Sequence, residues 1–533
     1  PALAQTLVGA DPASFPAHLS PALLHRRDLG SSLLGGPHEA LPVTAPFTGA
    51  VIGRCHLGTA ADVRFAVSRA RQAQPAWAAR PLRERAAVLL RFHDLLFERM
   101  QEGLDLIQFE GGKARVDALA EYLDVPLVAR YYGLHGPDAL ARERRRGFVP
   151  LLTQAEVNHV PVGVVGIIAP WNFPLTLSIT DALPALLAGN TVVLKPAEQT
   201  PFTALWVAQL LIEAGLPGEA LHVVPGRGEA VGPALIDAAN SVQFTGSTEV
   251  GKEVGRQASE ALTGASLELG GKNPLIVRHD ADLDRVMPGI RQACFGAAGQ
   301  VCVSAERLYV HESLFDAFVD RLRASAEAME VNARFDFSAH MGSLISAEQL
   351  ERVSAHVEDA VARGATLVAG GRALPEVGPF FYAPTVLTDV RPGMALYEGE
   401  TFGPVVAVYP FRTDDEAVER ANATAYGLNA SVWTRDVRAG RRMARRIEAG
   451  TVGVNDAYMA AWASTAAPMG GFKESGLGRR HGPEGLLKFT EAQTVAVQHG
   501  FPLAPGALGL SQELFMRITT EAIRLSRYLP GVR

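Results

Sequence analysis

The stretch VGVVGIIAPWNFP, residues 162–174, contains the strongest indication of the fold. It begins with a short apolar run rich in β-branched residues and ends in a turn stiffened by Pro170 and Pro174. Helical and β-rich runs then alternate, in ALPALLAGNTVVLKP (182–196), TALWVAQLLIEAGLP (203–217), ALHVVPG (220–226) and SVQFTGS (241–247). Strand, helix and strand at this spacing are typical of a parallel, doubly wound α/β sheet.

A second set of runs has the same character. NPLIV (273–277) predicts a strand, followed by a helix over 283–299, the strand ERLYV (306–310) and a helix over 313–330. Further β-rich runs follow, in ATLVAGG, APTVLTDV, PVVAVYP, ASVWT and GTVGVN. The chain has 533 residues and exceeds the roughly 250–300 residues at which a single core stops growing. Two α/β units in sequence are therefore the simplest account.

The ends of the chain differ from these units. Residues 1–45 mix proline, glycine and short apolar patches, which predicts an irregular N-terminal arm. This segment has no basic n-region, which argues against a signal peptide. From Thr59 onward the pattern predicts amphipathic helices that are interrupted near Pro75 and Pro81.

Two alternating runs, within 142–161 and 484–498, have no helical partners nearby and predict strands that pair outside both units. An amphipathic helix is predicted over 511–530. Its apolar positions are Leu514, Ile518, Ala522, Leu525 and Leu529. Contact with a membrane surface is one interpretation of this helix, but acidic residues among the basic ones weaken its attraction to anionic lipids. Packing against its own or a neighbouring subunit is therefore the favoured interpretation.

Composition excludes several classes of function. Apolar residues make up 48% of the chain, charged residues 20%, and the net charge is −6, which is typical of a soluble globular protein without a basic surface for nucleic acid. No uninterrupted apolar run of about 18 residues is present, so no transmembrane helix is predicted. Cys55, Cys294 and Cys302 show no metal-ligand spacing and make an odd number, so we expect neither a zinc site nor a disulfide framework, and a reducing cytoplasm fits best.

Several polar residues lie at predicted strand ends, where α/β sheets bind ligands. Asn172 follows the first strand, and Lys195 with Glu198 follows the second. Taken alone, Asn172 is as consistent with a capped turn, and the charged pair with a surface ion pair of little energetic value. Gly246 and Ser247 open a helix whose free N–H groups suit a pyrophosphate, although the local motif is a weak signal.

Glu268 and Cys302 are the residues that point most directly to catalysis. Glu268 stands in an apolar strand, where a charge is unfavourable unless it is paired or functional. Cys302, in FGAAGQVCVSAER (295–307), is by itself either a buried apolar residue or a nucleophile. A thiol, a base, an amide donor and a nucleotide turn at the loop ends of α/β units favour the nucleophile, which leaves Cys294 as a core residue.

The ordered motifs of the chain resemble those of the aldehyde dehydrogenase superfamily from about residue 45 to about residue 498. The matching motifs are PWNFP, LKPAEQTP, FTGSTEVGK, LELGGKNP, GQVCVSAER, EGETFGPV (398–405), YGLNASVWT (426–434), GTVGVN (450–455) and PMGGFKESGLGRRHGPEGLLKFTEAQTV (468–495). The resemblance implies cofactor-binding and catalytic doubly wound α/β domains, with a β-arm that forms homodimers, often paired into homotetramers. The implied domains are an N-terminal arm over 1–45, an NAD-binding domain over 46–141 and 162–272, a catalytic domain over 273–483, a β-arm over 142–161 and 484–498, and an extension over 499–533.

The resemblance also implies residue roles. Cys302 matches the nucleophile, Glu268 the general base, and Asn172, with the backbone N–H of Cys302, the oxyanion hole; Lys195 completes the catalytic set and grips the adenosine ribose with Glu198. The matching cofactor-binding residues are Ile168, Pro170, Trp171, Lys195, Glu198, Gly228, Thr245, Gly246, Ser247, Leu269, Glu400 and Phe402. The implied reaction converts an aldehyde to an acid through a thioester that water cleaves.

Glu198 bears on the choice of cofactor. A carboxylate beside the adenosine ribose accepts hydrogen bonds from two hydroxyls and repels a 2′-phosphate, so NAD is expected to be preferred, with NADP used less well. The chain resembles a bacterial succinate-semialdehyde dehydrogenase branch of the second type, which makes that small aldehyde the first expectation. An arginine that follows PWNFP in the main branch is absent here, where residues 178–181 read SITD. Medium-chain and aromatic aldehydes therefore stay open as substrates.

An alternative of a different class is a catalytically silent structural relative. Such a protein is expected to have lost the thiol or the base. This sequence retains Cys302, Glu268 and Asn172, which favours the enzyme.

Overall fold

The computed structural model describes residues 38–149, 152–332, 334–504 and 509–528. It divides into two compact units, the larger made of Pro1–Ala139 and Pro161–Phe489, and the smaller of Leu140–Val160 and Thr490–Arg533. Most of the predicted N-terminal arm lies outside the described residues. From Ala40 onward the chain forms an antiparallel hairpin of β1 (Ala40–Thr44) and β2 (Val51–His56).

The first sheet of the larger unit is the doubly wound sheet that the sequence predicts. Its strand order is β19-β9-β8-β5-β6-β7, and all neighbours are parallel except β19 and β9. The strands are β5 (Val164–Ile168), β6 (Thr191–Lys195), β7 (Leu221–Val223), β8 (Ser241–Thr245), β9 (Gly264–Glu268) and β19 (Gly476–Leu477). The chain order reverses between β5 and β8, and the carboxyl ends of strands at such a switch point form the usual ligand crevice.

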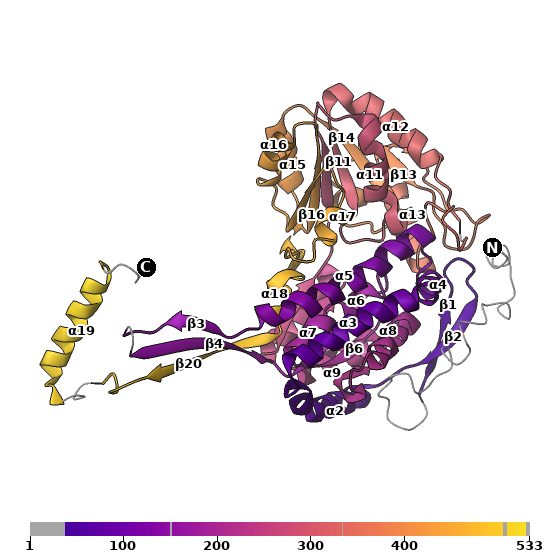
Figure 1. The fold of residues 1–533 in the computed structure, drawn as a ribbon. Coiled ribbons are helices and arrows are strands. Elements are labelled where there is room, and N and C mark those ends of the chain that lie inside the picture. Colours follow the sequence, from indigo (N-terminus) through magenta and orange to yellow (C-terminus); the bar gives the residue numbers. More distant parts are fainter. Residues whose placement is uncertain (1–37, 150–151, 333, 505–508, 529–533) are drawn as a thin grey trace. The chain divides into compact units, whose positions relative to one another are not determined.

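Helices flank this sheet (Figure 1). They are α2 (Ala60–Ala78), α3 (Leu82–Glu98), α4 (Met100–Gly111), α5 (Arg115–Ala139), α6 (Thr176–Ile179), α7 (Ala182–Ala188), α8 (Pro201–Glu213), α9 (Gly228–Ala238) and α10 (Thr248–Glu260). The predicted interruption near Pro75 is wrong, because Pro75 lies in the last turn of α2. A proline there removes one N–H donor shortly before the helix ends. The predicted interruption at Pro81 is confirmed, since α3 begins at Leu82.

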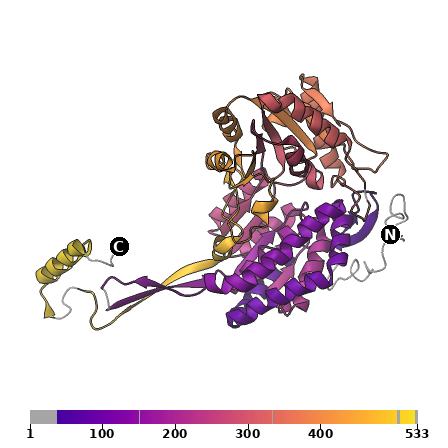
Figure 2. The same ribbon diagram turned by 45° about the horizontal axis from the view of Figure 1, so that its top comes forward.

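The second sheet has seven strands in the order β12-β13-β14-β11-β10-β16-β17, parallel except for β12. The strands are β10 (Asn273–Val277), β11 (Ala305–His311), β12 (Thr366–Ala369), β13 (Thr385–Thr388), β14 (Val405–Phe411), β16 (Asn429–Trp433) and β17 (Thr451–Val454). The helices of this region are α11 (Leu283–Phe295), α12 (Phe315–Glu327), α13 (Ala347–Ala362), α14 (Ala395–Glu398), α15 (Asp414–Asn422), α16 (Val437–Ala444) and α17 (Met459–Trp462) (Figure 2).

The connection out of the second sheet includes a two-stranded pair, β15 (Tyr426–Gly427) with β18 (Phe472–Lys473), and the short helix α18 (Gly482–Leu487). The run predicted as a strand from 486 therefore begins as helix. The strand itself starts at Thr490.

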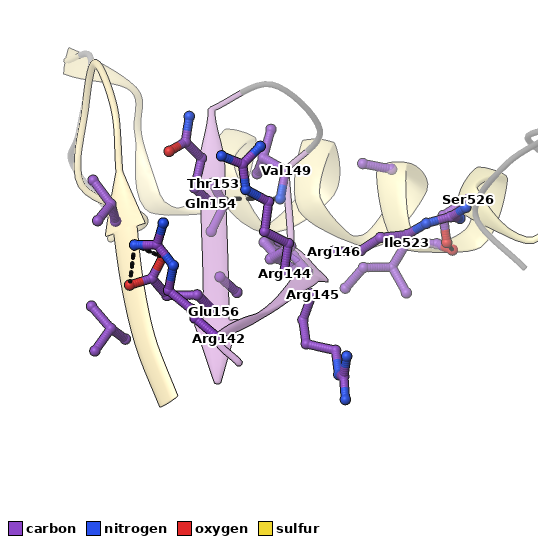
Figure 3. Close-up of a pocket in the computed structure, with 16 residues that line it drawn as sticks. Arg142, Arg144, Arg145, Arg146, Val149, Thr153, Gln154, Glu156, Ile523 and Ser526 are labelled. Carbon is purple, nitrogen blue, oxygen red and sulfur yellow. Dashed lines mark hydrogen bonds and ion pairs between the residues drawn. The ribbon is translucent and has the colours of Figure 1, made fainter. Parts of the chain in front are cut away.

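The smaller unit contains a three-stranded sheet in the order β20-β4-β3. Its strands are β3 (Glu143–Arg146), β4 (Thr153–Pro161) and β20 (Thr490–Gln498). Helix α19 (Gln512–Ser526) is capped by Ser511, whose hydroxyl accepts the N–H of Leu514. Between the sheet and α19 lies an open groove; four arginines and several apolar residues line its sheet side, and Ala522, Ile523 and Ser526 line it from α19 (Figure 3).

Helix α19 is shorter than the helix predicted over 511–530, and Leu529 and Pro530 lie outside the described residues. Ala522 and Ile523 line the groove. Leu514, Ile518 and Leu525, predicted to lie on the apolar face, are exposed in this unit. Among the described residues, no helix has the length and apolarity needed to cross a bilayer.

The core of the larger unit contains a buried carboxylate that caps a helix. The side chain of Thr200, which precedes α8, makes no capping hydrogen bond. Glu110, from α4, instead accepts the N–H groups of Phe202 and Thr203, each at 2.6 Å. This carboxyl group ties α4 to the first turn of α8, where the free N–H groups favour an acceptor.

Glu110→Ala should therefore lower the free energy of unfolding by about 1–3 kcal/mol, because two buried N–H groups lose their acceptor. The measurement is the melting temperature by scanning calorimetry, which should fall. Glu98→Ala, which removes an exposed glutamate paired with Arg91, is the matched control and should change it little. Equal melting temperatures for the two variants would contradict the capping role.

Candidate active site

The loop that carries Cys302 has an unusual backbone. Helix α11 ends at Phe295, not at 299 as predicted, because Ala297 and Ala298 adopt left-handed conformations with φ of 49° and 56°. Such dihedrals are unfavourable for alanine and persist only where surrounding structure imposes them. The chain then turns through Gly299 to Cys302, which is partly buried.

Two asparagine amides hold this loop. The Nδ2 group of Asn273, the first residue of β10, donates to the carbonyl of Cys302 at 2.7 Å. The Nδ2 group of Asn172 donates to the carbonyl of Gln300 at 2.9 Å. An amide nitrogen carries two hydrogens, so Asn172 keeps one donor beyond this bond. The predicted oxyanion donor therefore lies beside the loop of the predicted nucleophile.

Glu268 is the last residue of β9, and only 6% of its surface is exposed. Burial raises the pKa of Glu268 to about 7, while the positive charges of Arg480 and Lys488 act in the opposite direction. Within the described part of the chain, its Oε1 atom has no hydrogen-bond partner. A carboxylate with an open oxygen and a pKa near neutrality suits a general base.

Cys302 differs from the usual picture of an activated thiol. Burial, together with the negative charges of Glu400 and Glu268, raises the pKa of Cys302 to about 12, although the positive charge of Arg480 acts in the opposite direction. A thiol with this pKa is protonated at neutral pH. Its activation must therefore come from a base within reach, and Glu268 is close enough to act on it electrostatically.

The residues predicted to hold the adenosine ribose lie together at the carboxyl end of β6. The Nζ group of Lys195 lies 3.0 Å from Oε1 of Glu198. The N–H of Gly228, at the start of α9, donates to the same oxygen at 2.7 Å. Ile168 ends β5 directly opposite Lys195 in the parallel register, so these groups share one edge of the sheet.

The predicted pyrophosphate turn joins β8 to α10. Thr245 ends the strand, and Ser247 caps the helix by accepting the N–H of Val250 at 3.4 Å. The N–H of Gly246 donates to the carbonyl of Glu268 at 3.1 Å. The turn therefore also fixes the strand end from which Glu268 projects.

The predicted nicotinamide side brings together residues far apart in sequence. The rings of Trp171 and Phe402 meet edge to face, with centroids 5.5 Å apart. Phe402 has a φ of 57°, and its N–H donates to Glu306 at 3.0 Å. Pro170, directly before Trp171, is partly buried. These contacts hold both aromatic rings at one edge of the site.

Glu400 faces the two glycines that follow β9. Its Oε1 atom accepts the N–H of Gly271 at 2.9 Å. Burial raises the pKa of Glu400 to about 8, and the charge of Glu306 contributes. Leu269, beside these glycines, is buried and donates its N–H to the carbonyl of Ser475 at 2.9 Å.

A small cavity lies beside the Cys302 loop, two of whose residues, Ala297 and Val301, line it. It is lined by Asp117, Ala120, Phe173, Gln292, Ala297, Val301, Tyr458, Met459 and Trp462. The cavity is near Cys302 for two reasons. Val301 directly precedes Cys302, and the Tyr458 hydroxyl and the Cys302 thiol interact electrostatically. None of these lining residues is basic.

Sequence reasoning missed several residues of this site. Asn273 begins a strand, and no local feature singles it out as the group that holds the Cys302 carbonyl. Arg480, Lys488 and Asp181 form a buried charged cluster near Glu268. One feature of the sequence could have singled out Lys488: lysine occurs at only six positions of the chain, and Lys488 is one of them.

The raised thiol pKa predicts the pH dependence of alkylation. Without cofactor, the rate at which iodoacetamide modifies Cys302 should rise about tenfold per pH unit from about pH 7 to about pH 9, because the thiolate fraction rises in that proportion. Peptide mass spectrometry measures the labelling. Cys302→Ala should take up no label, since Cys55 and Cys294 are buried. A rate that levels off below about pH 8 would show that the pKa is not raised.

The comparisons with known proteins agree with this geometry. The model of the aldehyde dehydrogenase family matches residues 35–495. The protein named "Putative succinate-semialdehyde dehydrogenase" of Mycolicibacterium smegmatis, described as NADP(+)-linked, is 48% identical over 92% of this chain and 95% of its own. The phenylacetaldehyde dehydrogenase of Pseudomonas fluorescens is 38% identical over 91% and 98%.

A solved structure of an aldehyde dehydrogenase from Bacillus cereus with NAD+ superimposes with a TM-score of 0.82 at 35% identity, covering 90% of this chain and 98% of that one. The chain is thus similar to these enzymes over most of its length in both sequence and fold. It belongs to the aldehyde dehydrogenase family, an oxidoreductase family that converts aldehydes to acids with NAD(P).

Proposed function

We propose that Cys302 is the nucleophile, Glu268 the general base and Asn172 an oxyanion donor of this reaction. The observation that supports these roles most strongly is the convergence of the Cys302 loop, the open carboxylate oxygen of Glu268 and the amide of Asn172. These groups come from opposite edges of two sheets. Cys302 precedes β11, and Glu268 ends β9.

The chemistry follows from these positions. Glu268 takes the thiol proton, and Sγ of Cys302 bonds to the aldehyde carbon. Asn172 and the Cys302 N–H then hold the oxyanion, and the loss of one such donor costs roughly 10²–10³ in rate. A bound nicotinamide supplies the hydride acceptor. Glu268 releases the thiol proton to solvent before hydrolysis and is a carboxylate again. Water then cleaves the thioester: its proton passes to Glu268 as its oxygen bonds to the carbonyl carbon, and Sγ leaves as a thiolate.

Residues around the first sheet fit a dinucleotide. Lys195 and Glu198 would bind the ribose hydroxyls. Lys195 is also the fourth residue of the proposed catalytic set, with Cys302, Glu268 and Asn172. Gly228, Thr245, Gly246 and Ser247 frame the phosphate side. Ile168, Pro170, Trp171, Leu269, Glu400 and Phe402 would surround the nicotinamide half.

Two classes of substrate have support. The name of the Mycolicibacterium relative supports succinate semialdehyde. The cavity supports neutral aromatic or medium-chain aldehydes, because its walls carry Phe173 and Trp462 and no basic residue to pair with a substrate carboxylate. The phenylacetaldehyde dehydrogenase among the relatives agrees with this second class.

We also propose that the enzyme forms a homodimer or homotetramer through the β-arm. The burial pattern of β20 supports this, because nearly all its residues are exposed within one chain. Contact of α19 with a membrane surface is the alternative role for the extension. Cytoplasmic location is supported by the three cysteines, all of which are free thiols.

Cys302→Ala should abolish NADH formation from succinate semialdehyde, hexanal and benzaldehyde, because no other group in the site can form the thioester. The measurement is NADH absorbance, with wild-type protein beside the variant. The kcat/KM ratio between the aldehydes decides the substrate class. Activity that survives the substitution would exclude the proposed mechanism.

We infer that NAD is preferred over NADP, because Glu198 places a negative charge beside the adenosine ribose. Glu198→Ser should raise the kcat/KM for NADP relative to NAD by about tenfold or more, since a charge repulsion is removed. Steady-state kinetics with both cofactors measure this ratio. Glu213→Ser, a substitution of a partly exposed acid on α8, is the control. A wild-type enzyme that already favours NADP would refute the inference.

A further inference from the structure

A buried cluster of three charges lies behind the proposed general base. The carboxylate of Asp181 is 3.0 Å from Nη2 of Arg480 and 3.0 Å from Nζ of Lys488. The side chains of Asp181 and Arg480 are almost fully buried, and that of Lys488 is 12% exposed. Arg480 also donates to Oγ1 of Thr180 at 2.6 Å. Asp181 directly precedes α7, Arg480 lies between β19 and α18, and Lys488 directly follows α18.

The cluster packs on the face of the first sheet from which Glu268 projects. Lys488 donates to Oγ of Ser266 at 3.3 Å and to Oε1 of Gln243 at 2.6 Å. Ser266 and Glu268 are two residues apart on β9, so their side chains share a face. Gln243 lies opposite Ser266 in the parallel register of β8.

The backbone of Arg480 is also fixed close to Glu268. Arg480 and Met469 exchange both backbone hydrogen bonds, at 2.7 Å and 2.9 Å. The next residue, Gly470, approaches so closely that an added Cβ would lie 3.1 Å from Oε1 of Glu268. The segment that positions the Arg480 guanidinium therefore also forms a wall of the pocket around the base.

The charges of the cluster do not cancel. Two cations surround one carboxylate, which leaves one positive charge buried, and a buried charge is costly unless a counter-charge is near. Glu268 and Asp124 are the two further carboxyl groups that act on Arg480, and Glu268 is the one on the sheet face against which Lys488 packs. The charged and titratable groups that act on Glu268 are Arg480, Lys488, Asp181, Arg479 and the Cys302 thiol. Around the cluster itself lie Asp124, whose burial raises its pKa to about 7, and His481, whose burial lowers its pKa to about 3.

We propose that Asp181, Arg480 and Lys488 form a positioning cluster whose net positive charge keeps Glu268 available as a carboxylate during thioester hydrolysis. Arg480 acts through Glu268 and makes no bond to the reacting atoms. The proposal rests on the role of Glu268 as the base, and it adds which residues set the pH range over which that base works.

The proposal predicts that substitutions of the cations and of the carboxylate shift the ionisation of Glu268 in opposite directions. Arg480→Gln leaves Asp181 and Lys488 as a neutral pair, so Glu268 loses a favourable charge and should ionise at higher pH. Asp181→Asn leaves two cations without their carboxylate, so Glu268 should ionise at lower pH. Lys488→Met should behave like Arg480→Gln. A role confined to packing would not produce shifts of opposite sign.

The experiment measures hydrolysis of the acyl enzyme directly. Enzyme is mixed with NAD and an aldehyde that the wild type oxidises, quenched at intervals, and the acyl group on Cys302 is followed by intact mass from about pH 5 to about pH 9. The acid limb of the hydrolysis rate should move up by about 1 unit in Arg480→Gln and down in Asp181→Asn. Arg480→Lys should restore the wild-type limb. Arg479→Gln, which removes a neighbouring but partly exposed charge, should shift it far less.

The proposal would be overturned if the acid limb of the hydrolysis rate moved in the same direction in Arg480→Gln and Asp181→Asn. It would also be overturned if the acid limb moved in neither variant. If Arg480→Gln does not fold, as judged by its melting temperature, Lys488→Met against Asp181→Asn provides the same opposed pair. Absence of any acyl group on Cys302 in the wild type would instead refute the proposed function. Glu268→Gln should acylate Cys302 more slowly, because the thiol loses its base, and the acyl group that does form should hydrolyse without an acid limb.

Discussion

The close approach of backbone at Gly270 and Gly271 is the constraint on which the site depends. These glycines connect β9 to β10, and so join the carboxyl edge of one sheet to the amino edge of the other. A Cβ at Gly271 would lie 2.7 Å from the carbonyl of Cys302, and one at Gly270 would lie 2.5 Å from Oε2 of Glu400. The constraint is strictest at Gly271, because its neighbour is backbone, whereas the Glu400 side chain near Gly270 could shift. The absence of side chains here lets the thiol loop and the acidic loop converge on the strand end that carries Glu268.

Burial gives this site its electrostatic character. Glu268, Glu400 and Cys302 all have raised pKa values, and in each case the first cause is the removal of water. In such surroundings a single nearby charge has a large effect on protonation. The protein thus adjusts its reactive groups by charges held behind them, without direct contact with the reacting atoms.

Much of the fold could be predicted from the sequence, because apolar strands and amphipathic helices leave a strong local pattern. The runs around Val164–Ile168 and Ser241–Thr245 were recognisable as strands of a doubly wound sheet, and both are present. Element ends were less predictable. Alanine favours helices, so the prediction ran on to residue 299, although Gly296 directly after Phe295 is a possible helix end and α11 does end there, before the left-handed Ala297 and Ala298. Surrounding structure imposes that backbone.

Family motifs predicted the roles proposed for Asn172, Glu268 and Cys302, and in the structure Asn172 holds the Cys302 loop while Glu268 acts electrostatically on the thiol. The ion pair of Asp181 with Arg480 was not predictable, because about three hundred positions separate the two residues. The ionisation of Cys302 was also beyond sequence reasoning, since it depends on how much water reaches the thiol in the folded chain.

The strained turn at Ala297 and Ala298 has a consequence for how this chain can vary. Glycine at either position would remove the conformational penalty in the native state, yet it would also give the unfolded chain more freedom, so the two contributions to stability oppose each other. A more permissive backbone would widen the range of directions in which the following peptide N–H groups point. The alanines therefore favour a narrow distribution of loop geometries over a relaxed backbone, and glycine at either position is expected to lower the catalytic rate with little net change in stability.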